Sequence, residues 1–550
     1  MELPLFAGRI FRLHKEMTLY IVELEVVLDW RENMKLRKKI SMVVFLLVLL
    51  LGTSIVQAKT ILYVPQDDRP VSLEYVENTA KAAHINILVP PEEIIASRDK
   101  KGSPEKLWQW VIENGGQADA MVLSGDSLIY GGLVDSRTHS FDETVLQERV
   151  KRFCELHKKF PEVGLYVYST VLRTPQGSSG GVEPDYYEKY GWNIFQLTAL
   201  RDKKETVGLT RQEQEILDAD LAAVPSADLE DWMKRRQKNF AVNADLIDMD
   251  RQGVFRFFLL GRDDTSPYSQ SHKEGREFVK LAADLSADTF QTFPGADQLG
   301  MVMLVRAYND LTMQIPIVQV QYALGAGSDS VPSYEDQKIG KTIVDHITAA
   351  GGIVFAHPVN PDLVIAVNTP ETGKTLEAES SKNTTVLTPR ISKFVDDVED
   401  QLIAGKKVTI ADVSFANGSD NALMAELARR HLLDKLSSYS GWNTASNTLG
   451  YAIGQGMLSG AMSEKNRKRL LAIRYLDDWA YEANIRRELD EQIVYPDNGS
   501  IVYLNDMKPI LTAEAQKEER LFAEKNLWFR PEKIKVSFPW NRMFELKVEI

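Results

Sequence analysis

The sequence predicts an α/β protein built on a parallel sheet, either closed as a barrel-like (β/α) domain or open and doubly wound. From Lys59 onward, short apolar runs alternate with amphipathic helical stretches. The apolar runs are continuous, which is typical of strands buried on both faces, and the helices between them can supply the crossovers that parallel strands need. Of the two arrangements we expect the closed barrel.

Ten segments are expected to form strands, because each is a short apolar run bounded by turn residues. The helices between them include 104–116, which ends at paired glycines, and 141–160. In chain order the expected strands are TILYVP (60–65), INILVP (85–90), DAMVLSG (119–125), GLYVYST (164–170), VFRFFLLG (254–261), DTFQTFP (288–294), IPIVQVQY (315–322), GIVFA (352–356), DLVIAV (362–367) and KVTIADV (407–413).

Changes in this rhythm suggest how the chain is divided. Residues 59–314 form the main (β/α) domain, interrupted at 185–253 by highly charged, helix-like segments that we interpret as a helical insertion. Residues 315–405 repeat the strand–helix–strand pattern and predict a second, smaller α/β lobe. The chain then returns to the main domain at 406–500, and 501–550 form a C-terminal helix and strand extension.

The N-terminal region predicts export. Residues 34–58 combine a basic start, an apolar core and the small-residue ending Val56-Gln57-Ala58, the pattern of a secretory signal. We therefore interpret Met34 as the initiator and 1–33 as the product of a misplaced upstream start. Cleavage near Ala58 would leave an extracellular, periplasmic or envelope-associated protein without a stable membrane span; the alternative is an uncleaved anchor.

Composition excludes several classes of function. The chain of 550 residues has a formal net charge of −13 and no basic run, so nucleic acid is not an expected partner. Its single cysteine, Cys154, rules out an intramolecular disulfide and a cysteine-rich zinc site. No GxGxxG motif follows a strand, and a dinucleotide cofactor is disfavoured. The oligomeric state is not predicted.

The expected strands end in polar clusters rather than in single polar residues. In a parallel α/β fold, the loops after the carboxyl ends of the strands line the ligand crevice. Adjacent carboxylates repel one another unless a ligand or an arginine offsets their charge, so such clusters indicate a shared polar pocket. The candidate substrate-binding residues are Asp67, Asp68, Arg69, Arg137, Arg173, Arg262, Asp263, Asn417, Asp420, Trp442, Asn443 and Asn447.

Each candidate also has an ordinary structural interpretation. Asp264, Asp420 and Ser72 precede helical stretches and could serve only as N-caps. An aspartate beside an arginine can be a loop ion pair of little energetic value. Trp442, as a lone tryptophan, is more often a core residue than a platform for a ligand.

Paired carboxylates favour a carbohydrate-active hydrolase. Glycosidic cleavage needs a protonated acid for the leaving oxygen and an ionised carboxylate as nucleophile or base. Sugar pockets also use aspartate, asparagine and arginine for hydroxyl groups and tryptophan for a sugar face. We take Asp126, Asp264 and Asp297 as the catalytic candidates and a carbohydrate or cell-envelope glycan as the partner. No cofactor is expected, although a divalent cation is possible.

Two alternatives remain open. A metal-dependent hydrolase of phosphate-type esters could use Asp67, Asp126, Asp264 and Asp297 as oxygen ligands, with His357 as a nitrogen ligand. A non-catalytic exported protein could instead close two α/β lobes on a sugar or a cell-wall fragment.

Seven motifs of the chain are distinctive: QDDRP, SGDSLIYGGLVDSR, GRDDTSP, PGADQLG, DVSFANGSD, GWNTASNTLG and FPWNRMFE. Together they resemble an exported bacterial family known only as domain of unknown function family 4127. The resemblance implies export and one integrated architecture, and it brings no activity or catalytic residue with it. It covers nearly all of the chain after the signal, and residues 1–33 fall outside it.

Overall fold

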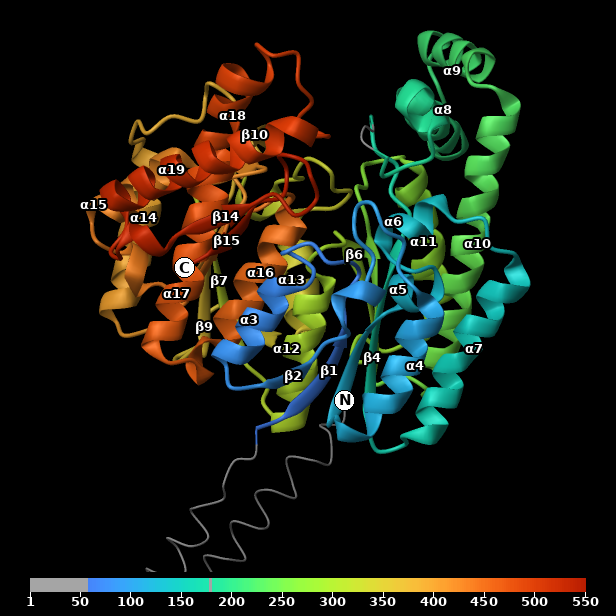
Figure 1. Ribbon diagram of the computed structural model, residues 1–550, viewed down its shortest axis with the longest axis horizontal. Helices are drawn as coiled ribbons and strands as arrows, with labels where there is room; N and C mark the ends of the chain where they lie inside the picture. The colour runs from blue at the N-terminus through green and yellow to red at the C-terminus, as the bar shows by residue number, and fades with distance from the viewer. Residues whose placement is uncertain (1–57, 178–180) are drawn as a thin grey trace, which may run out of the picture. The chain divides into compact units, whose positions relative to one another are not determined.

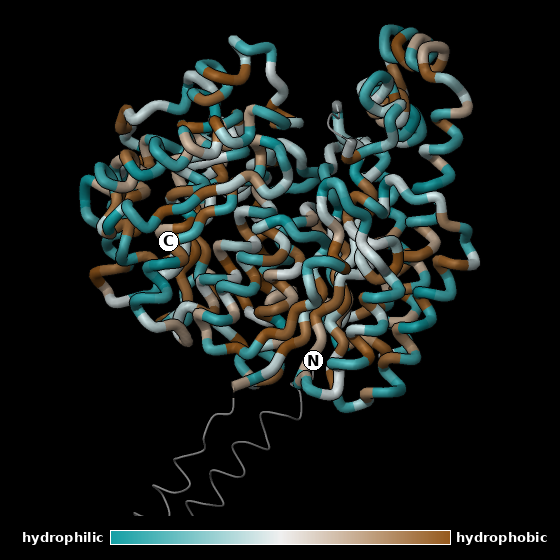
Figure 2. Tube along the Cα trace, viewed as in Figure 1, coloured by the Kyte–Doolittle hydropathy of each residue, from teal (hydrophilic) through white to brown (hydrophobic). Residues whose placement is uncertain are grey.

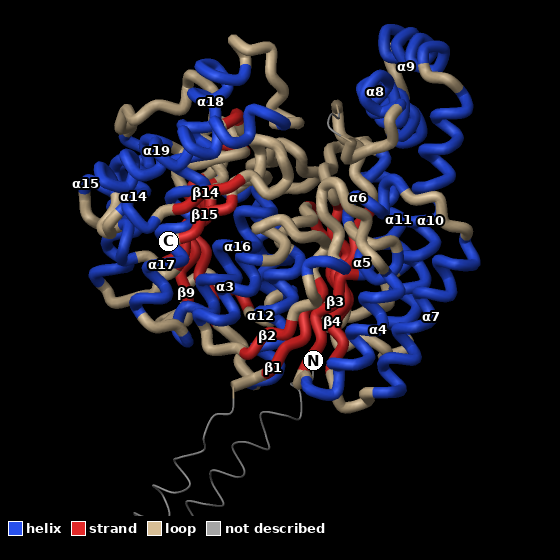
Figure 3. The backbone as a smooth tube through the Cα atoms, viewed as in Figure 1, coloured by secondary structure: helices blue, strands red, loops and turns tan. Residues whose placement is uncertain are grey.

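The apolar runs after Lys59 form two parallel sheets, which appear as two separate groups of strands in Figure 3. The computed structural model describes residues 58–177 and 181–550. The predicted upstream start at 1–33, and all but Ala58 of the predicted signal, lie outside the described residues. Residues from Ala58 to Ile550 form one compact unit.

The first sheet has six parallel strands in the order β2-β1-β3-β4-β5-β6. Its two edges, β2 and β6, do not pair with each other, so the doubly wound arrangement fits and the expected closure into a barrel is not confirmed. Burial on both faces explains the continuous apolar runs. The strands are β1 (Thr60–Val64), β2 (Asn86–Leu88), β3 (Ala120–Ser124), β4 (Gly164–Val171), β5 (Phe257–Arg262) and β6 (Phe290–Pro294).

The second sheet belongs to the smaller lobe and has the order β13-β11-β9-β7-β8, again all parallel. The expected boundary at 405/406 falls inside this sheet, because every residue of β11 is buried and pairs with β9 in register. Segment 406–500 therefore supplies two strands to the lobe rather than returning to the first sheet. The strands are β7 (Ile317–Tyr322), β8 (Ile353–Val354), β9 (Leu363–Asn368), β11 (Val408–Asp412) and β13 (Ser438–Ser440).

Four helices lie between the two sheets (Figure 1): α3 and α12 pack against strands of the first sheet, α16 packs against strands of the second, and α13 packs against both. One continuous hydrophobic core includes these helices and the facing sides of both sheets, and apolar residues concentrate there in Figure 2. The two sheets therefore share one core rather than having two. These helices are α3 (Glu74–Ala82), α12 (Leu299–Thr312), α13 (Ile339–Ala349) and α16 (Ala445–Leu458).

The outer face of each sheet is covered by its own set of helices, with separate apolar clusters. The first sheet is covered by α4 (Pro104–Asn114), α5 (Gly125–Ile129), α7 (Glu143–Lys159), α10 (Ser226–Arg251) and α11 (Gln270–Leu281). Helix α6 (Leu133–Thr138) follows α5 and packs against it. The second sheet is covered by α14 (Pro389–Ile403), α15 (Asn421–Arg429), α17 (Glu464–Arg474) and the π-helix Tyr475–Ile485.

Three helices occupy the segment between β4 and β5, where the sequence predicts the helical insertion. They are α8 (Tyr186–Thr206), α9 (Arg211–Ala223) and α10, which share a small apolar cluster of their own. Helix α9 begins at a capping box, in which Thr210 and Glu213 satisfy each other's backbone N–H groups.

The chain ends with two short helices, one long helix and a strand pair. These elements are α18 (Arg486–Leu489), the π-helical turn Asp490–Val494, α19 (Lys508–Asn526), and the antiparallel strands β14 (Lys535–Ser537) and β15 (Lys547–Glu549). A further short pair joins β10 (Leu376–Glu377) to β12 (Phe415–Ala416). Within residues 58–177 and 181–550, no helix is both long enough and apolar enough to cross a bilayer.

Candidate active site

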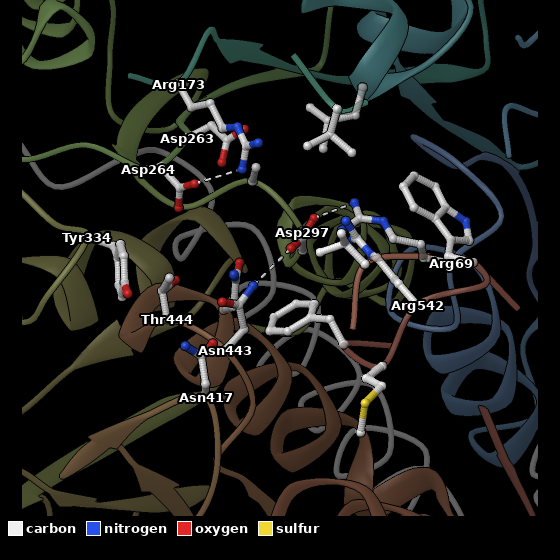
Figure 4. A pocket seen from close by; sticks show the side chains of 18 of the residues that line it. Arg69, Arg173, Asp263, Asp264, Asp297, Tyr334, Asn417, Asn443, Thr444 and Arg542 are labelled. Carbon is white, nitrogen blue, oxygen red and sulfur yellow. Dashed lines mark hydrogen bonds and ion pairs between the residues drawn. The ribbon is translucent and has the colours of Figure 1, made fainter. Parts of the chain in front are cut away.

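A cavity of about 480 Å³ is lined by segments that follow strands of both sheets (Figure 4). The carboxyl ends of parallel strands all point to the same edge of a sheet, which is why residues far apart in sequence meet here. The first sheet supplies Arg69 after β1, Arg173 after β4, Asp263 and Asp264 after β5, and Asp297 after β6.

The second sheet and the C-terminal extension close the other side of the cavity. Asn443, Thr444 and Asn447 follow β13 of the second sheet, at the start of α16 or just before it, and Asn417 follows β12 of the short β10–β12 pair. The aromatic rings of Tyr334, Trp540 and Phe544 complete the wall.

Asp297 is held from two directions and almost completely buried. One of its carboxylate oxygens forms a 2.6 Å ion pair with Arg69, and the other accepts a 3.2 Å hydrogen bond from the amide of Asn443 (Figure 4). Burial raises the pKa of Asp297, and the charges of Asp263 and Asp67 raise it further against the opposing effect of Arg69. The site therefore favours the protonated form of this carboxyl more than water does.

Asp263 and Asp264 are adjacent in sequence but sit in different environments. Asp263 is buried and paired with Arg137, and burial raises its pKa, with Asp264 adding to the effect. The Asp264 side chain is 24% exposed and forms a 3.0 Å ion pair with Arg173. Asp264 also adopts a backbone φ of 33°, a left-handed value that is uncommon outside glycine. Such conformations cost energy and often occur at functional sites.

Two of the amides that line the cavity also have left-handed backbones. Asn417 and Asn443 have φ values of 58° and 60°, which asparagine tolerates better than most residues. The amide of Asn417 donates a 2.7 Å hydrogen bond to Glu377, and that of Asn443 donates to Asp297. Their backbone conformation thus turns both amides toward the carboxylates of the cavity.

The structure brings most of the predicted site residues together. Of the catalytic candidates, Asp264 and Asp297 line the cavity. Of the binding candidates, those that line it are Arg69, Arg137, Arg173, Asp263, Asn417, Asn443 and Asn447.

Asp126, the third catalytic candidate, lies apart from the cavity. Helix α5 begins immediately after β3, and the loop after β1 covers this helix through hydrogen bonds from Ser127 to the carbonyls of Pro65 and Gln66. Asp126 is fully buried and accepts hydrogen bonds from Thr170 and Gln66. Burial raises its pKa to about 7.

Two more predicted residues support the cavity wall from behind. Asp67 is buried and holds Arg69 in a 2.8 Å ion pair. Asp68 accepts a 2.7 Å hydrogen bond from the indole of Trp540, and burial raises its pKa to about 6.

Three predicted binding residues have structural roles elsewhere. Arg262 turns away from the cavity and pairs with Asp336. Asp420 caps α15 by accepting hydrogen bonds from the backbone of Ala422 and Leu423, as the capping interpretation proposed. Trp442 is a core residue, 2% exposed, packed against Tyr451 and Phe544.

Several lining residues were not predicted from the sequence. Glu377 and Glu379 lie in or beside the two-residue strand β10, and Arg486 and Asp490 follow the π-helix Tyr475–Ile485. None of these segments has the pattern of a long strand followed by a polar tip. The motif FPWNRMFE contains the lining residues Trp540, Arg542 and Phe544. This motif is the sequence feature that could have indicated the C-terminal part of the cavity wall.

The metal alternative lacks a set of ligands. Across residues 58–177 and 181–550, no three His, Cys, Asp or Glu side chains are grouped so that they could hold a metal ion. The predicted nitrogen ligand, His357, is exposed and does not line the cavity.

Comparison with known proteins places the chain in a family. The family model described as "Protein of unknown function (DUF4127)" matches residues 61–549, almost the whole of the compact unit. No curated protein and no solved structure matches the chain. The chain belongs to the DUF4127 family, as its motifs predicted.

Proposed function

We propose that this member of the DUF4127 family is an exported carbohydrate-active hydrolase that cleaves glycosidic bonds in the cavity between the two sheets. One observation carries the proposal: two carboxyl groups with unlike environments, Asp264 and Asp297, line the same polar cavity. Enzymes that cleave glycosidic bonds need such an inequivalent pair.

The environments of the two carboxyl groups suggest which one is the general acid and which one is the nucleophile or base. Asp297 is the general acid, because burial and the neighbouring carboxylates favour its protonated form. It donates its proton to the glycosidic oxygen as the bond between carbon and oxygen breaks. Asp264 is the more exposed group, with a side chain that is 24% exposed and ion-paired with Arg173. It acts at the sugar carbon, directly as nucleophile or through a water molecule whose proton it takes.

The rest of the wall suits a sugar. Asn417, Asn443 and Asn447 offer amide groups for hydroxyls. Tyr334 is 42% exposed, and its hydroxyl is anchored 3.0 Å from a Glu377 oxygen, which leaves the ring available to a sugar face. Asp67, Asp68 and Asp263 hold the arginines and the indole of the wall in place rather than binding substrate themselves.

The proposal is tested by removing each carboxylate while keeping its shape. A panel of aryl glycosides should identify a substrate, and Asp264→Asn and Asp297→Asn should each lower kcat by a factor of about 10² to 10⁴. Binding of the same sugar, measured by calorimetry, should persist in both variants. The matched control is Asp142→Asn, an exposed position outside the cavity, which should leave kcat unchanged.

Other outcomes would contradict the hydrolase. Full activity in both variants would remove Asp264 and Asp297 from the chemistry. Tight sugar binding by the wild-type protein without any turnover would instead favour the non-catalytic exported binding protein.

A further inference from the structure

Carboxylates outnumber guanidiniums around the cavity. Five arginines line it, and each is already ion-paired with at least one carboxyl group, so an anionic ligand would have to displace a carboxylate. The pairs are Arg69 with Asp67 and Asp297, Arg137 with Asp263 and Glu183, Arg173 with Glu183 and Asp264, Arg486 with Glu379 and Glu482, and Arg542 with Glu545.

The surplus negative charge is largest at one part of the wall, which we call the acidic rim: Glu377, Glu379 and Asp490. Arg486 pairs with Glu379 at 2.7 Å, but it also pairs with the buried Glu482. In the described part of the chain, neither Glu377 nor Asp490 forms an ion pair of its own. Burial raises the pKa of Asp490, and the charges of Glu379 and Glu491 raise it further against the opposing effect of Arg486.

The cavity also contains buried polar atoms whose hydrogen-bonding capacity is unused. Asn447 is 3% exposed, and its side-chain oxygen has no hydrogen-bond partner among the described residues. The Nε of Arg137, which is 7% exposed, likewise has none. Buried polar groups rarely remain unsatisfied, and both residues line the cavity. A ligand that carries both donors and acceptors could form the missing hydrogen bonds with the Asn447 oxygen and the Arg137 Nε–H group.

We propose that the substrate is an amino-sugar glycan with free, protonated amine groups, and that the acidic rim binds one of those ammonium groups. The inference rests on the proposed carbohydrate function and specifies its substrate class. The ammonium group supplies the positive charge that Arg486 cannot supply to three carboxylates. Its N–H groups donate to the rim oxygens, and hydrogen bonds between charged partners are the strong ones. Sugar hydroxyl groups form hydrogen bonds with the side chains of Asn447 and Arg137.

The test compares three tetrasaccharides by isothermal titration calorimetry with the full chain, at a mildly acidic pH at which amines are protonated. The ligands are a glucosamine tetramer, its fully N-acetylated counterpart and tetragalacturonate. The glucosamine tetramer should bind at least about 10-fold more tightly than the acetylated one, and tetragalacturonate should bind most weakly.

Rim variants locate the effect. Glu379→Gln and Asp490→Asn should each weaken binding of the glucosamine tetramer by about 10-fold or more and change binding of the acetylated tetramer by less than about 2-fold. The matched control is Glu491→Gln, which changes the net charge equally on the same helical turn but lies outside the cavity wall. It should bind all three ligands as the wild type does.

The outcomes separate this inference from the proposed function. Equal affinity for the two glucosamine-type tetramers, or a preference for tetragalacturonate, would overturn the amino-sugar assignment and leave hydrolysis intact. Rim-dependent binding of the glucosamine tetramer without any turnover would support the assignment and contradict the hydrolase. Failure to bind all three ligands would overturn both.

Discussion

The carboxyl group of Asp126 is buried where a strand tip meets its helix, and its charge is expected to oppose folding. Its pKa is raised to about 7 by burial, against a usual value of 3.8. Between these two values the folded protein keeps a proton that the unfolded chain has lost. The stability of the folded state therefore falls as the pH rises through this window, and it does not recover above pH 7.

Asp126→Asn removes this titration. The stability of the variant relative to the wild type should therefore increase as the pH rises. The asparagine can still accept a hydrogen bond from Thr170 but cannot ionise. Relative to the wild type, the free energy of unfolding of the variant should increase from pH 5 to pH 8, with each unit of pKa shift worth about 1.4 kcal/mol. Chemical denaturation at both values measures it, and Asp142→Asn serves as the exposed control. An equal difference at pH 5 and pH 8 would show that Asp126 does not titrate as described.

At the residue scale, the sequence could predict which positions lie at strand tips but not where their side chains turn. Asp67 and Asp68 are neighbours, yet one binds Arg69 and the other binds Trp540, which is 472 positions away in the sequence. Such long-range partners decide whether a tip carboxylate faces the cavity or supports its wall. The acidic rim could not be predicted, because Glu377, Glu379 and Asp490 belong to short or irregular segments with no periodic pattern.

At the scale of elements, α10 of the helical insertion fixes the backbone that carries Arg173 into the cavity. Arg236 of α10 is 1% exposed and pairs with Glu274 of α11 at 2.6 Å. It also donates hydrogen bonds of 2.7 and 2.8 Å to the carbonyls of Leu172 and Arg173. The buried guanidinium of Arg236 thus connects the insertion to the backbone at the site.

Arg236→Met should destabilise the protein by about 3–5 kcal/mol, because it leaves the buried carboxylate of Glu274 without its cation. The double variant Arg236→Met/Glu274→Met removes both charges and should be more stable than the single variant. Urea denaturation measures both, and Arg211→Met, in an exposed ion pair on α9, should cost less than about 1 kcal/mol. If the double variant is no more stable than the single one, the lost carbonyl hydrogen bonds carry the effect instead.

Elements themselves were easier to predict than the way they assemble. Continuous apolar runs such as those of β3, β4 and β5 could be recognised because burial on both faces leaves no polar alternation. Closure into a barrel could not be decided, because it depends on whether the edge strands β2 and β6 pair. The same applies to β11, whose apolar sequence fits either sheet and whose place is set by its register with β9.

At the scale of the whole unit from Ala58 to Ile550, the helices between the sheets determine how it unfolds. Side chains of α12 and α16 and the facing sides of both sheets belong to one hydrophobic core. Separating the sheets would expose that core to water, at a cost of about 25 cal/mol for each Å² of apolar surface. A protein that works by hinged closure of two independent lobes would have no such shared layer.

We therefore expect the two sheets to unfold in one cooperative transition. Curves from tryptophan fluorescence and far-ultraviolet circular dichroism should coincide in guanidinium chloride, as in two-state unfolding. Leu449→Ala, in the fully buried centre of α16, should shift the entire transition by about 2–5 kcal/mol rather than only part of it. Leu246→Ala, on the outer side of the first sheet, should also shift the entire transition. A plateau between two separate transitions, with each variant moving only one of them, would show that the sheets are independent lobes and would favour a hinged binding protein over a preformed active site.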